Sequence, residues 1–390
     1  MAAEPGTEGP PAKVADGRYE LQRLLGKGGF AEVWLGRDLS TGTAVAVKLE
    51  DLREQALQLE DEAEVLRVLQ EPSPTHAAPS KQGRAGASKT ALPQGVAALH
   101  HLGDEGRYVS MVTELLGKSL QDCFLERGGR LTAASVVLVA EQALQRIEHL
   151  HSKGFIHRDI KPENFVFGLG DKVHHLYLID FGLSKRYHNG TRHVPLQTGC
   201  SRTGTPRYAS LNALRGVEQS RRDDLEALGY MLVFFLRGVL PWSGLEAATP
   251  EETYSRILQK KEEVGLNELC EGLPDAFRTY LKRVRGMGFT DCPDYAALRR
   301  LFRDFRRQQG LLQDYHFEWL DSQHLGAIES LHWQRCRQPD DEHPGSMAAL
   351  ALQVKALLFG CGGTDVASDG GLSDSSECDA SDSDPSECGP

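Results

Sequence analysis

The sequence predicts an α+β fold in two lobes, a small β-rich N-terminal lobe with one helix and a larger, mainly α-helical C-terminal lobe. Short runs of β-type residues separated by turns occupy residues 19–50 and 96–114. A single helical pattern, residues 57–69, interrupts them, with one apolar face made by Leu59, Ala63, Leu66 and Leu69. From Ser119 onward the spacing of apolar residues becomes helical, which places the larger lobe second.

Composition limits the class of protein. The chain has 390 residues, 40% of them hydrophobic, which is ample for a sizeable core. Residues 1–17 contain no apolar run that could be a signal peptide, and no stretch of 18 apolar residues could span a bilayer. The eight cysteines show no CxxC spacing, which favours reduced thiols over a disulfide framework or a structural metal. We therefore expect a cytoplasmic protein, a nuclear protein or one found in both compartments.

Negative charge is concentrated at the C-terminus. Of the formal net charge of −11, residues 364–390 carry −8 without a single Lys or Arg, so the rest of the chain carries only −3. A body this close to neutral argues against a nucleic-acid-binding surface.

The first strands, residues 19–25, 31–37 and 44–50, are connected by turns, and the first of these turns is rich in glycine. Glycines let backbone N–H groups approach phosphate oxygens closely, although most such turns simply join two strands. Val33 follows, placed to cover an adenine ring. Lys48 ends an apolar strand, and from there it could reach α and β phosphates. The alternative interpretation is a lysine at a strand edge whose charged end reaches solvent.

The helix over residues 57–69 should carry a glutamate that pairs with Lys48. Periodicity alone does not choose among three candidates, Glu60, Glu62 and Glu64. Residues 71–95 after the helix are rich in Pro, Ser, Ala and Gly, and we interpret them as a disordered surface insertion rather than a docking segment. Two further strands, residues 96–102 and 108–114, complete the small lobe.

The larger lobe begins with helices over residues 119–126 and 133–152, and the segments that carry the chemistry follow: His157-Arg158-Asp159-Ile160-Lys161-Pro162-Glu163-Asn164 and Asp180-Phe181-Gly182. Asp159 is placed to orient an attacking hydroxyl and accept its proton, and Lys161 to steady a transferring phosphoryl group. Asn164 and Asp180 offer the hard oxygen ligands that Mg²⁺ prefers. A solvated surface loop would explain single residues but not this order and spacing.

Three neighbouring residues have structural roles in this interpretation. We expect His157 and Phe181 to pack in the apolar interior, and Asp224 to accept hydrogen bonds from the backbone of the catalytic loop.

These residues resemble those of eukaryotic protein kinases and, more narrowly, the casein kinase 1 family. The most specific stretch is Gly204-Thr205-Pro206-Arg207-Tyr208-Ala209-Ser210-Leu211-Asn212, which has Ser-Leu-Asn where other kinases carry Ala-Pro-Glu. The resemblance runs from about residue 19 to residue 319, apart from the insertion. Its other matching stretches are residues 114–120, 180–187, 218–226, 240–242 and 293–295.

The resemblance implies a two-lobed protein-kinase fold, ATP and Mg²⁺ as cofactors, and transfer of phosphate to Ser or Thr. It implies protein substrates with acidic or already phosphorylated segments, and it selects Glu62 as the partner of Lys48. The implied catalytic residues are Asp159, Lys161, Lys48 and Glu62, and the implied metal ligands are Asn164 and Asp180. The implied ATP-binding residues are Gly26, Lys27, Gly28, Gly29, Phe30, Ala31, Val33, Ala46, Lys48, Thr113, Glu114 and Leu116. The implied substrate or anion site comprises Arg158, Lys185, Thr205, Arg207 and Gly244.

The sequence departs from this family where the anion site would lie. Cys200 stands in place of a usual lysine, and Thr249-Pro250-Glu251-Glu252-Thr253 stands in place of a basic stretch. Because phosphate recognition depends on clustered Arg and Lys, we expect a weakened preference for primed substrates. The same basic stretch is linked in the family to nuclear or centrosomal targeting, which leaves the compartment open.

The predicted domain organisation has four parts. They are a disordered leader (1–17), a kinase domain (18–319), a C-terminal extension with a helix at about 346–359 (320–360) and an acidic, Ser/Asp-rich disordered tail (361–390). Within the kinase domain, the N-lobe covers 18–113, the hinge 114–117 and the C-lobe 118–319.

Two parts of the C-terminal region have alternative interpretations. The helix at 346–359 packs on the large lobe or docks a partner. The tail either becomes phosphorylated and inhibits the basic cleft near Arg207, or serves only as a solubilising segment. Deletion of residues 361–390 separates the two, because only removal of an inhibitor raises activity.

The leading functional hypothesis is an active Ser/Thr protein kinase that acts as a monomer. The rival is a pseudokinase or scaffold that binds partners through the insertion, the extension helix and the acidic tail. The presence of the whole catalytic set favours the active enzyme. A kinase of a small molecule is disfavoured by the complete activation segment at residues 183–212.

Overall fold

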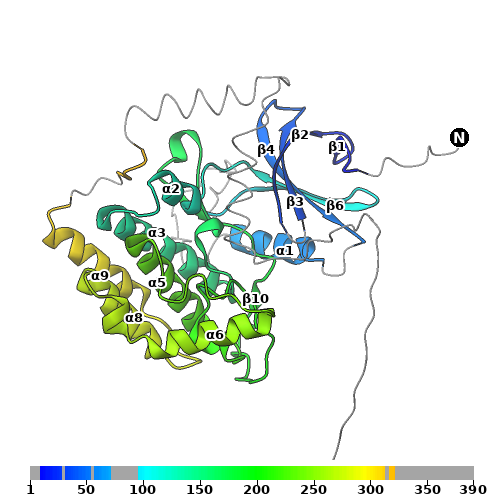
Figure 1. Cartoon of the computed structure of the whole chain (residues 1–390). Helices are drawn as coiled ribbons and strands as arrows, with labels where there is room; N and C mark the ends of the chain where they lie inside the picture. The colour runs from blue at the N-terminus through cyan, green and yellow to red at the C-terminus, as the bar shows by residue number, and fades with distance from the viewer. Residues whose placement is uncertain (1–8, 29–30, 54–56, 72–94, 312–315, 321–390) are drawn as a thin grey trace, which may run out of the picture. The chain divides into compact units, whose positions relative to one another are not determined.

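The computed structural model describes residues 9–28, 31–53, 57–71, 95–311 and 316–320. All of them lie within one compact unit, Met1–Gln338. The long strands form one β-rich lobe and most of the helices form a second lobe, as the blue and green-to-yellow parts of Figure 1 show. The predicted two-lobed α+β fold is confirmed.

The N-terminal lobe is built on an antiparallel sheet with the strand order β1-β2-β3-β4-β6-β5. Its strands are β1 (Lys13–Val14), β2 (Tyr19–Lys27), β3 (Ala31–Asp38), β4 (Ala44–Asp51), β5 (Leu99–Asp104) and β6 (Tyr108–Glu114). The five strands predicted from the sequence correspond to β2 through β6.

Alternation along β4 determines what each face of the sheet carries. Val45, Val47 and Leu49 are buried in an apolar cluster with Tyr19 and Val112. Because successive side chains of a strand point to opposite faces, Lys48 and Glu50 lie on the other face. Both make hydrogen bonds to the helix α1 (Leu59–Gln70) or to the residue that precedes it.

Helix α1 agrees with the helix predicted over residues 57–69, and all four residues of its predicted apolar face are buried. Its first N–H groups are satisfied from outside the helix. The Glu50 carboxylate accepts from the backbone N–H of Gln58 at 2.8 Å and of Leu59 at 3.0 Å. A carboxylate here also faces the positive end of the helix dipole. Glu50 is only 2% exposed, so solvent does not weaken these bonds.

The C-terminal lobe is mainly helical. Its helices are α2 (Leu120–Glu126), α3 (Ala133–Ser152), α4 (Leu211–Leu214), α5 (Arg221–Arg237), α6 (Pro250–Glu263), α7 (Leu266–Leu269), α8 (Asp275–Arg285) and α9 (Tyr295–Gln308). α3 has the bounds predicted for it and packs against α5 and α9. α3 and α5 are buried on most of their surface, which explains why apolar residues surround both helices.

Short strands frame the segments that carry the candidate chemistry. β7 (Phe155–Ile156) pairs with β10 (Lys185–Arg186), and β8 (Phe165–Phe167) pairs with β9 (Leu176–Leu178). A single 3₁₀ turn, η2 (Pro162–Asn164), lies between β7 and β8. The catalytic-loop residues therefore lie on irregular backbone whose two ends are fixed by strand pairing.

Residues 316–320 belong to the larger lobe although they follow its last helix. Phe317 is fully buried, 4.9 Å from the ring of Phe167 and 4.9 Å from the ring of Trp319. Glu318 accepts hydrogen bonds from the N–H and the hydroxyl of Thr132 at the start of α3. The segment thus packs under β8 and the first turn of α3.

The prediction of a disordered leader over residues 1–17 needs correction. Lys13 and Val14 pair with β2, and Val14 is fully buried in the outer cluster of the sheet. The Ala15 N–H donates to Glu105 at 2.7 Å. A single apolar side chain at the sheet edge is enough to order this part of the leader, and a composition argument misses it.

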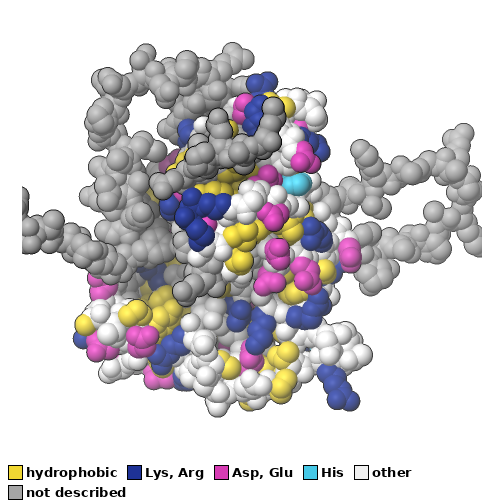
Figure 2. All heavy atoms as spheres, turned by 90° about the vertical axis from the view of Figure 1, so that its right-hand side faces the viewer, with side chains coloured by type: hydrophobic (Ala, Val, Ile, Leu, Met, Phe, Trp, Pro, Cys, Tyr) yellow, Lys and Arg dark blue, Asp and Glu magenta, His cyan; other side chains and the backbone are white. Residues whose placement is uncertain are grey.

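Other predictions lie outside the described residues. These are residues 1–8 of the leader, nearly all of the insertion, the extension helix and the acidic tail. No helix in the described ranges is both long enough and apolar enough to cross a membrane. On the face drawn in Figure 2, basic and acidic side chains are interspersed.

Candidate active site

Lys48 contacts two carboxylates, one from each lobe. Its Nζ donates to Glu62 on α1 at 2.6 Å and to Asp180 at 3.1 Å. Glu62 is 4% exposed, whereas the other two candidates, Glu60 and Glu64, are exposed. The structure therefore brings Glu62 to Lys48, as the resemblance implied and periodicity could not decide.

This cluster keeps its lysine charged. Burial by itself would lower the pKa of Lys48, but the carboxylates of Glu62 and Asp180 raise it above the usual value for lysine. Burial raises the pKa of Glu62 against the opposing effect of Lys48. Burial would also raise the pKa of Asp180, and the Lys48 cation reverses this and lowers it. An ammonium group kept charged in this way can donate hydrogen bonds to phosphate oxygens.

Strand register aligns several predicted ATP-binding residues. Gly26 pairs with Val33, Val33 with Lys48, and Lys48 with Met111. Side chains directly opposite each other in a ladder share a face, so Val33, Lys48 and Met111 form one row. Met111 is 3% exposed, and nothing in its local sequence distinguishes it as a member of this row. Ala46 pairs with Thr113 in the neighbouring row.

The glycine-rich turn is partly described. A Cβ added at Gly26 would meet nothing within 4 Å, so packing does not require glycine there. Close approach to a ligand remains as a physical reason for that glycine. The Gly28 N–H donates to the Ala31 carbonyl at 2.8 Å, and Lys27 pairs with Glu32 at 2.9 Å. Gly29 and Phe30 lie outside the described residues.

The predicted hinge is tied to β8 and its neighbours. The Gly117 N–H donates to the carbonyl of Phe167 at 2.7 Å. A Cβ at Gly117 would lie 3.1 Å from the carbonyl oxygen of Gly168, so this close approach favours glycine. Glu114 forms an ion pair with Lys172 at 2.5 Å, which turns its carboxylate toward the larger lobe. Leu116 is half-buried between these contacts.

Asp159 lies at the centre of the catalytic loop. The Lys161 Nζ is 2.6 Å from one of its oxygens, and the N–H and hydroxyl of Thr205 donate to the other, each at 2.8 Å. The Asn164 side chain donates to the Asp159 carbonyl at 2.9 Å. These contacts bring together the predicted base, the phosphoryl-steadying cation and one predicted metal ligand.

Asp224 on α5 fixes the backbone of this loop. It accepts from the N–H of His157 at 2.7 Å and of Arg158 at 2.9 Å, which confirms the structural role expected from the sequence. Arg158 has φ of +68°, a left-handed conformation that costs a non-glycine residue free energy. His151 bonds the same carboxylate at 2.8 Å, so a buried network supports the strained turn.

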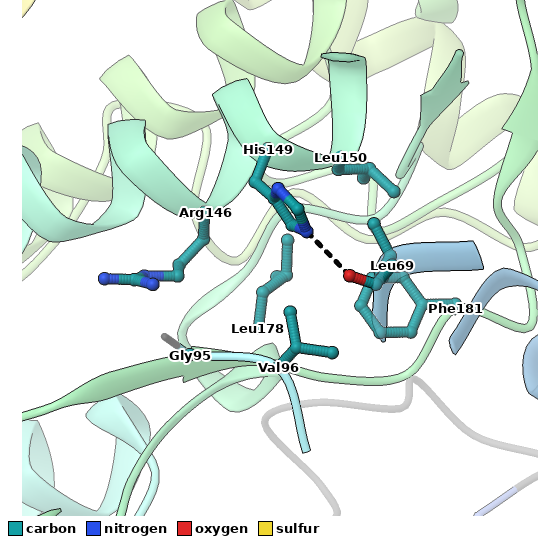
Figure 3. A pocket seen from close by; sticks show the side chains of 8 residues that line it. All are labelled: Leu69, Gly95, Val96, Arg146, His149, Leu150, Leu178 and Phe181. Carbon is teal, nitrogen blue, oxygen red and sulfur yellow. Dashed lines mark hydrogen bonds between the residues drawn. The ribbon is translucent and has the colours of Figure 1, made fainter. Parts of the chain in front are cut away.

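His157 and Phe181 pack in the interior as expected, with ring centroids 5.5 Å apart. Phe181 also lines a small cavity between α1 and α3, shown in Figure 3. At about 10 Å³ the cavity has room for a single water molecule. Across it, His149 Nε2 bonds the carbonyl oxygen of Leu69 at 2.9 Å, drawn as the dashed line. The end of α1 is therefore held against α3 close to Phe181.

The predicted anion site is only partly assembled. The Lys185 Nζ donates to both oxygens of Glu218 at 2.9 Å, and the Cys200 Sγ lies 3.7 Å from the same carboxylate. The Arg158 Nε donates to the carbonyl of Leu183 at 2.7 Å. Sequence reasoning did not assign Glu218, which offsets the charge of the lysine expected to attract anions.

Arg207 and Gly244 take no part in these hydrogen bonds of Lys185 and Arg158. The carbonyl of Arg207 accepts from the Trp242 indole N–H at 2.8 Å, and its guanidinium lies 5.8 Å from the centre of the Phe234 ring. Gly244 is exposed and has φ of +75°. Thr205 bonds Asp159 rather than the cations, so it lies with the catalytic loop.

The site has suitable ligands for Mg-ATP. Asp180 keeps 44% of its side chain exposed, so one of its oxygens can reach a metal ion while the other bonds Lys48. The Asn164 NH₂ group is used in its bond to Asp159, which leaves the amide oxygen for a cation. One carboxylate and one amide oxygen suit Mg²⁺, which takes its remaining ligands from phosphates and water. Bound Mg-ATP would supply the transferable phosphoryl group.

Residues 19–275 match the family model described as the protein kinase domain. The match begins at the first residue of β2 and ends at the first residue of α8. It includes all the candidate catalytic and metal-binding residues described above.

Proposed function

The chain belongs to the protein kinase family, and we propose that it is a Ser/Thr protein kinase of casein kinase 1 type. It transfers the γ-phosphoryl group of Mg-ATP to Ser or Thr of protein substrates. The observation that carries this proposal is the joint assembly of two groups of contacts. Lys48 bonds Glu62 and Asp180, and Asp159 bonds Thr205 beside Lys161.

Each group has a distinct chemical role in phosphoryl transfer. Lys48 holds nucleotide phosphates, and Glu62 keeps its ammonium group in place. Asp180 and Asn164 bind Mg²⁺. Asp159 orients the substrate hydroxyl and accepts its proton, while Lys161 stabilises the charge on the transferring group. Catalysis in this reaction depends mostly on positioning and electrostatics, and the observed contacts serve both.

The choice of Ser/Thr and of casein kinase 1 type rests on the activation segment. Its Ser-Leu-Asn sequence at residues 210–212 resembles that family, and other kinases carry Ala-Pro-Glu there. The two hydrogen bonds from Thr205 to Asp159 support the assignment, since they link the catalytic carboxylate to the segment that would hold a peptide.

We expect protein substrates with acidic or phosphorylated segments, with a weakened preference for priming phosphate. The pairing of Lys185 with Glu218 supports the weaker preference, because a neutralised lysine attracts anions less. Residues 249–253, where the family has cations, begin α6 with Thr249 as its N-cap and two acids in its first turn, Glu251 and Glu252. We further propose a monomer found in the cytoplasm, the nucleus or both.

The central test is phosphorylation of a degenerate peptide library by the purified protein with Mg-ATP. The library carries Ser, Thr and Tyr acceptors, and Asp180→Asn serves as the blank. We expect incorporation into Ser and Thr peptides well above the blank. Incorporation no greater than that of the blank would reject the enzyme in favour of a scaffold, and a preference for Tyr would reject the Ser/Thr assignment.

A second test addresses priming. Paired peptides with and without phosphoserine three residues upstream of the acceptor should be phosphorylated at similar rates. A gain of about tenfold or more from the phosphate, the effect of a well-formed charge-assisted bond, would contradict the weakened preference.

A further inference from the structure

Lys261 on α6 is fully buried, and the hydrogen bonds of its ammonium group within the described part of the chain go to backbone carbonyls and not to an acid. Its Nζ donates to two backbone carbonyls, those of Pro206 at 3.0 Å and Ala209 at 2.6 Å. Burying an ammonium group is costly unless its donors are satisfied. The two bonds therefore offset the cost of burying Lys261, and they also hold the segment that contains Pro206 and Ala209.

Two aromatic rings also lie close to Lys261. Its Nζ lies 4.5 Å from the centre of the Tyr230 ring and 4.9 Å from that of Trp242. Such faces attract a cation through the ring quadrupole. The lysine is therefore held by carbonyl dipoles and π faces, and the segment that supplies the carbonyls is the one next to Asp159.

Side chains outside that segment bind most of its carbonyls. The hydroxyl of Tyr254 donates to Gly204 at 3.2 Å, and the Trp242 indole donates to Arg207 at 2.8 Å. Together with the two bonds from Lys261, four carbonyls between residues 204 and 209 are fixed by side chains. We call Lys261, Trp242 and Tyr254 the carbonyl clamp.

Helix geometry explains how α6 contributes two members of the clamp. Tyr254 and Lys261 are seven residues apart, which places them on one face two turns apart. Ile257, between them on the same face, is 6% exposed and packs into the core. The α6 face that packs on the lobe thus presents its polar tips to the segment at residues 204–209.

We propose that Lys261 is a positioning residue for peptide substrates. Through the carbonyls of Pro206 and Ala209 it fixes the backbone on either side of Arg207, and so it holds Thr205 against Asp159. This inference rests on the proposed kinase function, because it assigns residues 204–209 to peptide binding. Lys261 is far from the glycine-rich turn in sequence, and its hydrogen bonds and ring contacts within the described residues go to Pro206, Ala209, Tyr230 and Trp242, none of which is expected to bind ATP.

The test compares Lys261→Met with Lys260→Met. Methionine keeps the length and volume of the buried side chain but cannot donate, so two carbonyls lose their partner. The loss of such bonds predicts a rise of about tenfold in KM for a peptide substrate, with the KM for ATP changed less than about twofold. Lys260 is the matched control, because its side chain is 40% exposed and forms an ion pair with Glu263 on the surface of α6.

Hydrogen exchange gives a readout that does not depend on catalysis. The amides of Tyr208 and Ala209 both bond the Thr205 carbonyl at 3.0 Å, and they should exchange faster in Lys261→Met than in Lys260→Met. α3 provides the internal reference. If the wild-type protein transfers no phosphate, the proposed function fails, and the clamp is still judged by exchange alone.

Two milder variants keep the proposal testable if Lys261→Met does not fold. Tyr254→Phe removes the hydroxyl donor and keeps the ring, and Trp242→Phe removes the indole N–H donor and keeps a smaller aromatic ring. Both should raise the peptide KM and the exchange rate in the same direction. Unchanged exchange and peptide KM in the folded variants would overturn the proposal. Parallel rises in the KM for peptide and for ATP would also overturn it, since they indicate general loosening.

Discussion

Thr205 donates both its backbone N–H and its hydroxyl to the same oxygen of Asp159, each at 2.8 Å. The other oxygen of Asp159 faces Lys161 at 2.6 Å. The candidate base is thereby held in one orientation from two sides. Gly204 makes this approach possible, because a Cβ there would lie 2.3 Å from the Arg158 carbonyl oxygen.

Substitution of Thr205 tests whether this orientation matters. Thr205→Ala removes the hydroxyl bond to an ionised group, worth about 1.5–3 kcal/mol, so kcat should fall about tenfold or more. Thr205→Ser keeps both donors and should retain most of the activity. Steady-state kinetics with a peptide substrate measure the difference. Equal kcat values for the Ala and Ser variants would show that the hydroxyl has no such role.

Glu62 should be the only one of the three neighbouring glutamates on α1 that catalysis needs. Glu62→Gln weakens the bond that holds Lys48, and we expect kcat/KM to fall about 10- to 100-fold. Glu60→Gln and Glu64→Gln, at exposed positions of the same helix, serve as controls and should stay near the wild type. A similar loss in all three variants would point to the helix as a whole.

Glu50 should stabilise the start of α1. Glu50→Ala leaves the N–H groups of Gln58 and Leu59 without their buried acceptor. Losing such a cap costs about 1–2 kcal/mol of unfolding free energy. Urea denaturation compares this variant with Glu60→Ala, which removes an exposed acid from the same helix. Activity should fall with stability only in Glu50→Ala, because α1 also carries Glu62. Equal midpoints would contradict the capping role.

The sequence alone could predict contacts between residues that lie close together along the chain. Asp159, Lys161 and Asn164 fall within one short segment, and the structure brings the other two into contact with Asp159. Helices with a regular apolar face, such as α3, could also be predicted, since burial of that face determines the helix. Short-range patterns and the fold agree in these places.

Residues that act across long separations could not be predicted from such patterns. Lys261 contacts carbonyls more than 50 positions away, and Glu218 lies 33 positions from Lys185. Each is an ordinary charged residue in its local sequence. Periodicity also treats every glutamate as a surface residue, so it could not single out Glu62 on the buried face of α1. Val14 was missed because one apolar residue makes no pattern.

Phe317 should be required for the stability of the larger lobe although it lies beyond the residues matched by the family model. Its ring is fully buried against Phe167 and Trp319. Phe317→Ala should cost about 3–5 kcal/mol, as truncation of a buried aromatic residue does. Val239→Ala, at a position 55% exposed, is the apolar control. A loss in thermal or urea unfolding no larger than the control's would show that residues 316–320 are dispensable.

Asp223 should make the protein less stable as the pH rises toward neutrality. Its carboxylate accepts from the hydroxyl of Ser210 at 2.5 Å and from the N–H of Ser220 at 2.7 Å, and Arg222 Nε lies 3.8 Å away. Burial nevertheless raises the pKa of Asp223 to about 7. An unfolded aspartate has a pKa near 3.9, so between about pH 4 and pH 7 the folded state binds more protons than the unfolded state.

The contribution of Asp223 to the unfolding free energy is therefore highest below pH 4, falls between pH 4 and pH 7 and is constant above pH 7. The side chain introduced by Asp223→Asn cannot titrate. The variant should therefore lose less unfolding free energy between pH 5 and pH 8 than the wild type does. Asp171→Asn, at an exposed position, controls for the change of charge. Urea unfolding at both pH values measures the effect. The same pH dependence in the wild type and in Asp223→Asn would exclude a raised pKa at Asp223.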